Sequence, residues 1–243
     1  MTGILLSSSS ISQLTLTASQ TDVLCNGSCD GTIDASATGS IHDPFEYSLD
    51  GGAYQTGTSF TGLCGGSYTL VVRDTILATD TVIVTITEPS LLNANAGTDF
   101  TGCEGDNAVL NGSASGGTAP YTYFWDLGDG NNSSLQSPSH TYAAGIYAAT
   151  LTVTDANGCA SASATTTTTI NAFPVVSVDA TTNVTCSGYC DGSINVSGGI
   201  TYTWDDPGNQ TTAAATNLCP GTYTVTVTDP NGCINTGSAT ITE

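Results

Sequence analysis

Apolar and polar residues alternate one by one in several short segments of the 243-residue chain. A period of two is typical of strands that bury one face, so these segments predict half-buried β-strands. The clearest examples are Tyr68, Leu70 and Val72; Val82, Val84 and Ile86; and Tyr223, Val225 and Val227. Thr, Ser, Val, Ile and Tyr are abundant, and no window has an apolar stripe at helical spacing. The pattern therefore predicts an all-β fold.

Turn-forming residues separate the strands. In the first part of the chain, strands are expected near residues 13–24, 31–37, 45–49, 53–60, 67–73 and 80–87. Two later turns, Asp155-Ala-Asn-Gly158 and Asp229-Pro-Asn-Gly232, contain Asn-Gly, which supplies the positive φ of a tight hairpin. Short strands at intervals of about 8–12 residues are typical of an immunoglobulin-like sandwich, so we expect sandwiches of about seven strands.

The sequence repeats itself at its two ends. TDVLCNGSCDGTID at 21–34 corresponds to TNVTCSGYCDGSIN at 182–195, and LCGGSY at 63–68 corresponds to LCPGTY at 218–223. We therefore expect homologous outer domains at 13–89 and 173–243, a different domain at 90–172, and a preceding N-terminal segment at 1–12. The last residue falls at a repeat boundary, so we also expect a segment of a longer array.

The charge balance excludes several functions. The chain has a formal net charge of −20, and Arg73 is its only basic residue besides two histidines. Nucleic acids and anionic membranes would repel such a chain, so we expect neither nucleic-acid binding nor membrane insertion. Without lysine, Schiff-base chemistry, P-loop nucleotide binding and Lys–Asn isopeptide crosslinks are impossible. The content of 39% hydrophobic residues favours a folded chain over an acidic disordered tail.

Nine cysteines indicate an oxidising compartment, because a small, acidic, lysine-free β-protein is typical of secreted proteins. The thiols of CNGSC and CSGYC are separated by three residues, whereas zinc sites usually contain CxxC pairs or nearby histidines. We therefore expect disulfides rather than a metal, and an extracellular or cell-surface location. The candidates are Cys25, Cys29, Cys64, Cys103, Cys159, Cys186, Cys190, Cys219 and Cys233.

The alternation of strand ends predicts how these cysteines pair. Two trios should each gather at one end of an outer sandwich, namely Cys25, Cys29 and Cys64, and Cys186, Cys190 and Cys219. We expect one bond within each trio and a spare thiol that meets a late turn of the next domain. This links the first trio to Cys159, and Cys103 to Cys233. A Cys103–Cys159 bond is the alternative, because strand-end geometry decides which pairs lie within about 7 Å.

The motifs resemble two extracellular families. The middle domain resembles a PKD domain, through Trp125-Asp-Leu-Gly-Asp-Gly130 followed by His140-Thr-Tyr142. The outer domains resemble SprB repeats of large Bacteroidota surface adhesins, through Cys25-Asn-Gly-Ser-Cys29-Asp-Gly and the segment Leu218–Cys233. The resemblance implies secretion, cell-surface display and an adhesive or scaffold role without catalysis. Ala78, which stands where the third domain has Cys233, departs from the pattern.

Carboxylates in turns are the candidates for a metal site. Asp126, Asp129 and Asn131 form an oxygen-rich loop, and Ca²⁺ prefers such ligands. Glu88, Asp99 and Asp179 are further candidates near domain junctions. No EF-hand or other calcium-repeat motif is present, so the alternative is that these carboxylates only cap turns. We expect no resident cofactor, with calcium as the one open possibility.

Catalytic and aromatic candidates favour structural roles. His42 and His140 lie in turns without a nucleophile elbow, and the four glutamates suggest no catalytic pair, so we expect no enzyme. Trp125 and Trp204 occupy equivalent places, which favours core tryptophans over a sugar-binding platform. The loop residues Tyr54 and Tyr189 are better candidates for exposed aromatics.

We therefore predict three tandem immunoglobulin-like sandwiches in an extended rod, acting as a structural subunit of an extracellular filament or stalk. The alternatives are a segment of a surface adhesin and a carbohydrate-binding accessory module, so surface glycans are a second possible partner. For a filament, the partner is another copy, joined head to tail through the apolar strand Ile4, Leu5 and Leu6.

Overall fold

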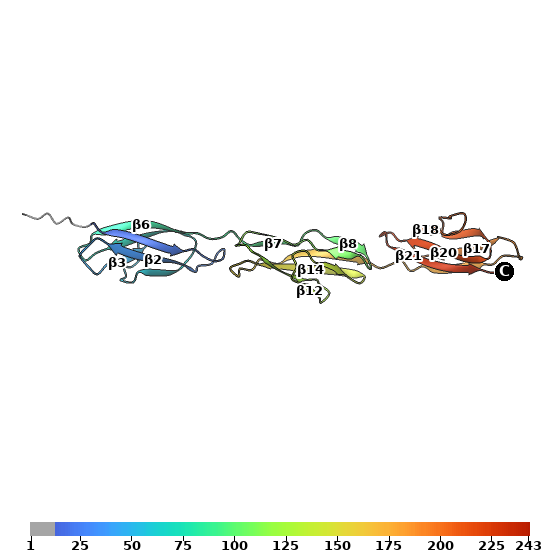
Figure 1. The fold of residues 1–243 in the computed structure, drawn as a ribbon, viewed down its shortest axis with the longest axis horizontal. Coiled ribbons are helices and arrows are strands. Elements are labelled where there is room, and N and C mark those ends of the chain that lie inside the picture. Colours follow the sequence, from blue (N-terminus) through green and yellow to red (C-terminus); the bar gives the residue numbers. More distant parts are fainter. Residues whose placement is uncertain (1–12) are drawn as a thin grey trace, which may run out of the picture. The chain divides into compact units, whose positions relative to one another are not determined.

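The computed structural model describes residues 13–243, and it contains strands and turns but no helix in that range (Figure 1). The prediction of an all-β fold is confirmed. Within the same residues, a membrane-spanning helix is absent.

The first sandwich consists of six strands, β1–β6, in two antiparallel sheets. One sheet has the order β1 (Thr15–Thr21), β2 (Gly31–Thr38), β4 (Ser59–Leu63), and the other has the order β3 (Glu46–Leu49), β5 (Gly66–Arg73), β6 (Thr79–Ile86). In the second sheet Leu70 lies opposite Val82, and Tyr68 lies opposite Val84. The predicted alternation thus places the apolar residues of β5 and β6 on one face.

That face closes the core of the first sandwich. Ile33, Leu70 and Val72 are fully buried, and Ile86 is 2% exposed. Burying an aliphatic side chain of this size stabilises the fold by about 1.5–3 kcal/mol, so the period of two is what holds the sheets together. The intervening residue Ile83 is 70% exposed, as the alternation requires.

The strand that the sequence predicts at 53–60 lies further along the chain, at Ser59–Leu63. Strand β3 ends at a turn in which Asp50 and Gly51 both have positive φ, and the ladder resumes only at Ser59. Between them only Gln55 pairs with a strand residue, exchanging both backbone hydrogen bonds with Tyr47. The first sandwich therefore has six strands rather than about seven among the described residues.

The middle region carries nine strands, β7–β15. A five-stranded sheet has the order β12 (Asn132–Ser133), β11 (Thr122–Asp126), β14 (Gly145–Thr154), β15 (Ala164–Asn171), β8 (Phe100–Cys103). Two short pairs accompany it: β10 (Ser113–Ser115) with β7 (Asn93–Asn95), and β13 (Ser139–Thr141) with β9 (Asn107–Val109). Strands β8 and β15 run parallel. Trp125, Leu151 and Val153 are fully buried here.

The third sandwich, β16–β21, repeats the topology of the first. Its sheets have the orders β16 (Ser177–Thr182), β17 (Gly192–Ser197), β19 (Ala214–Leu218), and β18 (Thr201–Trp204), β20 (Gly221–Thr228), β21 (Ile234–Ile241). Trp204, Val225 and Val227 lie in its core. The repeat seen in the sequence is therefore a repeat of strand order.

The chain divides into two compact units. Unit 1 holds the first sandwich together with segments 114–122 and 153–162, and unit 2 holds segments 95–113, 123–152 and 163–243. The loop that carries Cys159 thus belongs to unit 1, and Cys103 belongs to unit 2. All contacts described below lie within one unit.

Candidate functional site: the cysteine loops

Eight of the nine cysteines form disulfides. The pairs are Cys25–Cys159, Cys29–Cys64, Cys103–Cys233 and Cys190–Cys219. Cys186 is exposed and unpaired within residues 13–243, which contain all nine cysteines. Cys29–Cys64 and Cys190–Cys219 each join residues within a single outer sandwich. The other two pairs join residues 134 and 130 positions apart.

The two short-range disulfides occupy the same place in the two outer sandwiches. Cys29 lies two residues before β2, and Cys64 directly follows β4, where Gly31 pairs with Leu63. Cys190 and Cys219 flank the equivalent pair of β17 and β19. A Cβ on Gly31 would lie 2.9 Å from the carbonyl oxygen of Leu63, so glycine is required where the bridged strand ends converge.

The Cys25–Cys159 disulfide is accompanied by a specific backbone contact. Asn157, in the turn that carries Cys159, donates its side-chain amide to the carbonyl oxygen of Leu24 at 3.0 Å. Leu24 directly precedes Cys25, so the hydrogen bond and the disulfide tie the same two loops together. Asn157 therefore recognises the backbone of the loop to which Cys159 is bonded.

Asp155 shapes the turn that carries Cys159. Its Oδ1 accepts the backbone N–H groups of Asn157 and Cys159, both at 2.9 Å. Its Oδ2 accepts the N–H of Thr118 at 2.9 Å. Together these hydrogen bonds hold the pKa of Asp155 below its ordinary value, and the bond from Thr118 contributes most. Burial of the carboxylate opposes this shift. An ionised Asp155 thus fixes the backbone that positions the bonded sulfur of Cys159.

The Cys103–Cys233 disulfide is built in a similar way. Asp229 Oδ1 accepts the N–H of Cys233 at 2.8 Å, and Asp106 Oδ2 accepts the N–H of Cys103 at 2.7 Å. Each cysteine is therefore positioned by an aspartate of its own turn. The first sandwich has the same turn without the thiol, because Asp74 Oδ1 accepts the N–H of Ala78 at 2.9 Å.

These pairs fit the scheme that strand-end alternation predicts, which leaves open the two members of each trio that bond to each other. The alternative Cys103–Cys159 bond does not form, because both residues are bonded elsewhere. The sequence alone does not single out Cys186 as the spare thiol of its trio.

The three predicted calcium ligands contact protein groups. Asn131 donates its backbone N–H and its side-chain amide to the carboxylate of Asp129, at 3.0 and 2.9 Å. Asp126 Oδ1 accepts the N–H of Gly128 at 3.0 Å. Within residues 13–243, no three or more His, Cys, Asp or Glu side chains gather in a way that fits a metal ion. The turn-capping interpretation describes these contacts.

His140 is the partner of Asp129 that the sequence does not reveal. Its Nε2 lies 2.7 Å from Asp129 Oδ2, and its ring meets the ring of Tyr142 edge-on at a centroid distance of 4.4 Å. Burial opposes ionisation of Asp129, but hydrogen bonds from Asn131 and His140 outweigh it and lower its pKa to about 2. The pair fastens β13 to the turn after β11.

The other polar candidates bond locally. His42 accepts the N–H of Thr75 through its carbonyl oxygen at 3.2 Å. The glutamates and junction aspartates form the bonds Arg73–Glu46, Gly27–Glu88, Ala144–Glu104, Ser187–Glu243, Thr167–Asp99 and Ser197–Asp179. The junction candidates Glu88, Asp99 and Asp179 thus each accept a hydrogen bond from a protein group.

Both tryptophans are core residues. Trp125 is fully buried, Trp204 is 1% exposed, and each donates its indole N–H to a backbone carbonyl, of Gln136 and Thr212 respectively. The prediction of core tryptophans is confirmed. Tyr189 is 61% exposed, whereas Tyr54 lies under the guanidinium of Arg73, whose Cζ is 3.7 Å from the ring centroid.

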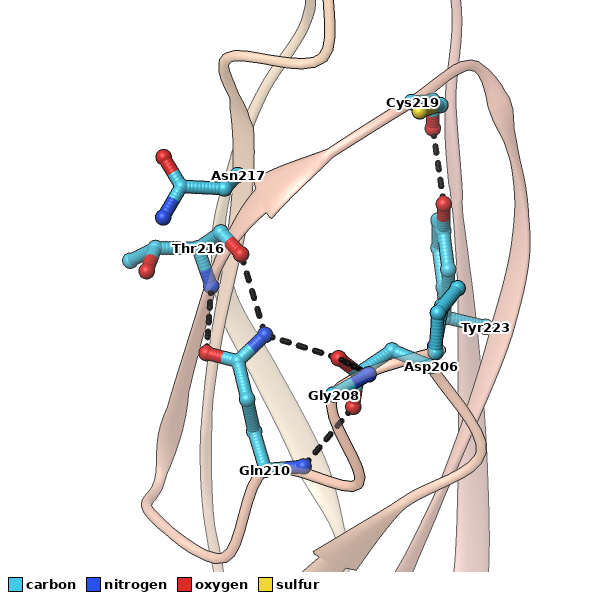
Figure 2. Close-up of a pocket in the computed structure, with 8 residues that line it drawn as sticks. Asp206, Gly208, Gln210, Thr216, Asn217, Cys219 and Tyr223 are labelled. Carbon is cyan, nitrogen blue, oxygen red and sulfur yellow. Dashed lines mark hydrogen bonds between the residues drawn. The ribbon is translucent and has the colours of Figure 1, made fainter.

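A hollow of about 280 Å³ lies in the third sandwich between the loop after β18 and the β19–β20 turn (Figure 2). The side-chain amide of Gln210 spans it: Nε2 donates to Asp206 Oδ2 and to the carbonyl of Thr216, and Oε1 accepts the N–H of Thr216. Burial opposes ionisation of Asp206, but bonds from Gln210 keep its pKa below the ordinary value. The polar groups of this hollow are therefore largely committed to holding its own loops.

The polymer contact candidates Ile4, Leu5 and Leu6 lie outside the described residues. Head-to-tail contact through them stays a prediction.

Models of two domain families match the chain. The PKD domain model matches residues 93–170, which include the middle region with its buried Trp125. The SprB repeat model matches residues 17–54, which include the loop between Cys25 and Cys29. The chain contains a PKD domain and an SprB repeat. The SprB-like character of the third sandwich stays a prediction, since its residues lie outside both matched ranges.

Several solved structures resemble the chain at low identity. The three N-terminal domains of the bacteriophage RB49 Highly Immunogenic Outer Capsid protein share 14% identity over 96% of this chain and 100% of that one, with a TM-score of 0.47. The D00-D0 domain of intimin shares 14% over 63% and 100%, with a TM-score of 0.31. The chicken CNTN1 FN1-FN3 domains share 8% over 92% and 97%, with a TM-score of 0.29. At these scores the likeness says nothing about activity or partners. No curated protein matches the chain.

The PKD domain, the SprB repeat and four disulfides together support a cell-surface repeat protein. PKD domains are typically non-catalytic structural or adhesive modules.

Proposed function

We propose that the chain is a non-enzymatic structural segment of an extracellular filament or cell-surface stalk that bears tension. One observation carries the proposal: the disulfides Cys25–Cys159 and Cys103–Cys233 connect loops more than a hundred residues apart, in addition to the peptide linkers. We call these two bonds the junction disulfides. Such bonds give a load-bearing chain a second covalent path.

The junction disulfides shorten the covalent path through the chain. With all four bonds, the shortest path from residue 13 to residue 243 follows 13–29, 64–103 and 233–243. At about 3.5 Å per extended residue this path is about 240 Å long. With only the two short-range bonds, the path includes 64–190 and is about 590 Å long. The junction disulfides thus limit how far a pulled chain can lengthen.

Either junction disulfide sets this limit alone. Without Cys103–Cys233, the shortest path follows 13–25, 159–190 and 219–243, and it is again about 240 Å long. The two bonds are therefore redundant against extension, as a load-bearing element that survives the loss of one bond requires.

Single-molecule pulling from the termini tests the proposal. We expect Cys25→Ser/Cys159→Ser and Cys103→Ser/Cys233→Ser, each made alone, to leave the maximum extension near that of the parent. The combined variant should more than double it. An equal maximum extension in all four proteins would contradict a load-bearing role of these bonds. Binding of the parent to defined glycans on an array would instead favour a carbohydrate-binding module.

For a filament, the partner that we propose is another copy, joined through residues 1–12. Deletion of these residues followed by electron microscopy tests this. Loss of filaments supports it, and filaments that persist unchanged contradict it. An intact chain that stays monomeric at high concentration would favour a segment of a surface adhesin.

A further inference from the structure

The loop around Cys186 is folded like the loop around Cys25, although only Cys25 is bonded. Ser28 donates its N–H to the carbonyl of Cys25 at 3.0 Å, and Tyr189 donates its N–H to the carbonyl of Cys186 at 3.1 Å. The residue before each cysteine donates its N–H to an aspartate six positions on. The neighbouring Cys190–Cys219 disulfide also matches Cys29–Cys64. The third sandwich therefore contains the same loop as the first, but its cysteine, Cys186, is unpaired.

The turns whose cysteines bond to the partner loops share one sequence and one hydrogen-bond pattern. Both bonded turns have the sequence Asp-x-Asn-Gly-Cys, at 155–159 and 229–233, and in both the aspartate accepts the N–H of the cysteine. The turn at 74–78 has the same bond but ends in Ala78. The turn that bonds to Cys25 therefore has two defining features. An aspartate accepts the N–H of its cysteine, and the side-chain amide of Asn157 donates to a backbone carbonyl.

We infer that Cys186 is an attachment site for the Asp-x-Asn-Gly-Cys turn of a further immunoglobulin-like sandwich, closed by a disulfide. The inference rests on the proposed function and names the partner of one loop. The asparagine of the incoming turn donates its amide to the carbonyl of Thr185, as Asn157 does to Leu24. A second unmodified copy is not the partner, because Cys159 and Cys233 are bonded and the remaining turn ends in Ala78.

The bond forms by thiol–disulfide exchange with a small-molecule disulfide such as oxidised glutathione. The thiolate of Cys186 attacks one glutathione sulfur, the S–S bond breaks, and one glutathione leaves as a thiol. The thiolate of the partner turn then attacks the sulfur of Cys186 and displaces the second glutathione. Two thiols lose two protons and two electrons, and one glutathione disulfide becomes two glutathione molecules.

The first test supplies the missing turn within the full chain. Residues 75–78 are replaced by the sequence of 156–159 through Thr75→Ala, Ile76→Asn, Leu77→Gly and Ala78→Cys. Leu77 already has a φ of 65°, close to the 84° of Gly158, so the graft keeps the turn. In a glutathione buffer we expect a ladder of covalent oligomers on a non-reducing gel, abolished by reductant and by Cys186→Ser.

A matched thiol elsewhere controls for random oxidation. Ser134→Cys places an exposed thiol in a loop without the Asx turn. We expect the grafted chain to crosslink through Cys186 about tenfold more than this control at equal concentration, because docking raises the effective concentration of the thiols. Equal crosslinking of the two variants would overturn the inference. It would leave the pulling experiment unaffected, so the two proposals fail separately.

The second test uses native surface material and needs no variant. Non-reducing peptide mapping should find Cys186 joined to a peptide with the Asp-x-Asn-Gly-Cys sequence. If reduction releases a separate polypeptide, the partner is another chain; if it does not, the partner lies in the same polypeptide. Cys186 recovered as a free thiol, or capped by glutathione, would overturn the inference.

Discussion

The first and third sandwiches have the same strand order and the same Cys-x-Gly-x-Cys loop, yet they use it differently. In the first sandwich, Cys25 is bonded to Cys159, whereas the equivalent Cys186 is unpaired. Their late turns differ in the opposite sense, because Ala78 stands where the third sandwich has the bonded Cys233. Two copies of one strand order thus differ in which of their equivalent cysteine positions form a disulfide.

The largest effect that we predict sharpens this comparison in the core. Trp204→Ala should destabilise the third sandwich by about 3–5 kcal/mol, because it removes a large buried side chain and leaves a cavity. The first sandwich should not change. Hydrogen exchange of β20 and β5 amides measures both at once. Tyr189→Ala, at a 61% exposed position, is the control and should shift stability by less than about 0.5 kcal/mol. Equal loss of protection in β5 would show that the outer sandwiches do not unfold independently.

The short-range disulfides provide the next test. Cys29→Ser/Cys64→Ser and Cys190→Ser/Cys219→Ser open loops with sequence separations of 35 and 29 residues. Each double variant should lose about 2–4 kcal/mol of its own sandwich's stability, since the bond limits the unfolded chain. Urea unfolding followed by hydrogen exchange measures each loss. A much larger loss in one sandwich would break the equivalence of the two copies.

A smaller effect distinguishes the two junction disulfides. The side-chain amide of Asn157 donates to the carbonyl of Leu24, whereas Asn231 donates its backbone N–H locally to Asp229. Asn157→Ala should lose about 1 kcal/mol, the usual contribution of one hydrogen bond, and make Cys25–Cys159 about fivefold easier to reduce. Titration with reduced and oxidised glutathione measures this ratio. Asn231→Ala is the matched control, and the same increase for Cys103–Cys233 would contradict a specific role of Asn157.

The last effect concerns acid and the Asp129–His140 pair of the middle region. The pKa of Asp129 is lowered to about 2 from an ordinary value near 3.8. Its contribution to stability is therefore present above about pH 4 and is lost as the pH falls towards 2. We expect a loss on the order of 1 kcal/mol, because solvent screens a pair so near the surface. Asp129→Asn should remove this part of the acid dependence, which hydrogen exchange of β13 measures, and an unchanged dependence would contradict it.

The pairing of the cysteines is predictable from the sequence for a physical reason. Strands that alternate direction return every second turn to the same end, so a cysteine next to a turn has few possible partners. Strand β4 is harder to place, because Gly51, Gly52 and Gly57 leave the run at 53–60 free to turn before it pairs.

The sequence pattern does not predict contacts between side chains of different turns. Asp129 and Asn131 suggest a metal loop by spacing, but the partner that matters is His140 on another strand. The hollow beside Gln210 is lined by loop residues, among them Asn217 with a positive φ, and no pattern of residue types predicts it. Periodicity reports which face a residue occupies, whereas these contacts depend on how loops fold back.

The scarcity of basic residues has a consequence for proteolysis. Trypsin cleaves only after lysine or arginine, so Arg73 offers the single tryptic site of the chain. That site lies at the end of β5, where the side chain bonds to Glu46 at 2.6 Å and covers Tyr54. If it were cut, Cys25–Cys159 would still hold the two fragments together across the break. Digestive enzymes of this specificity therefore leave the chain in one covalent piece.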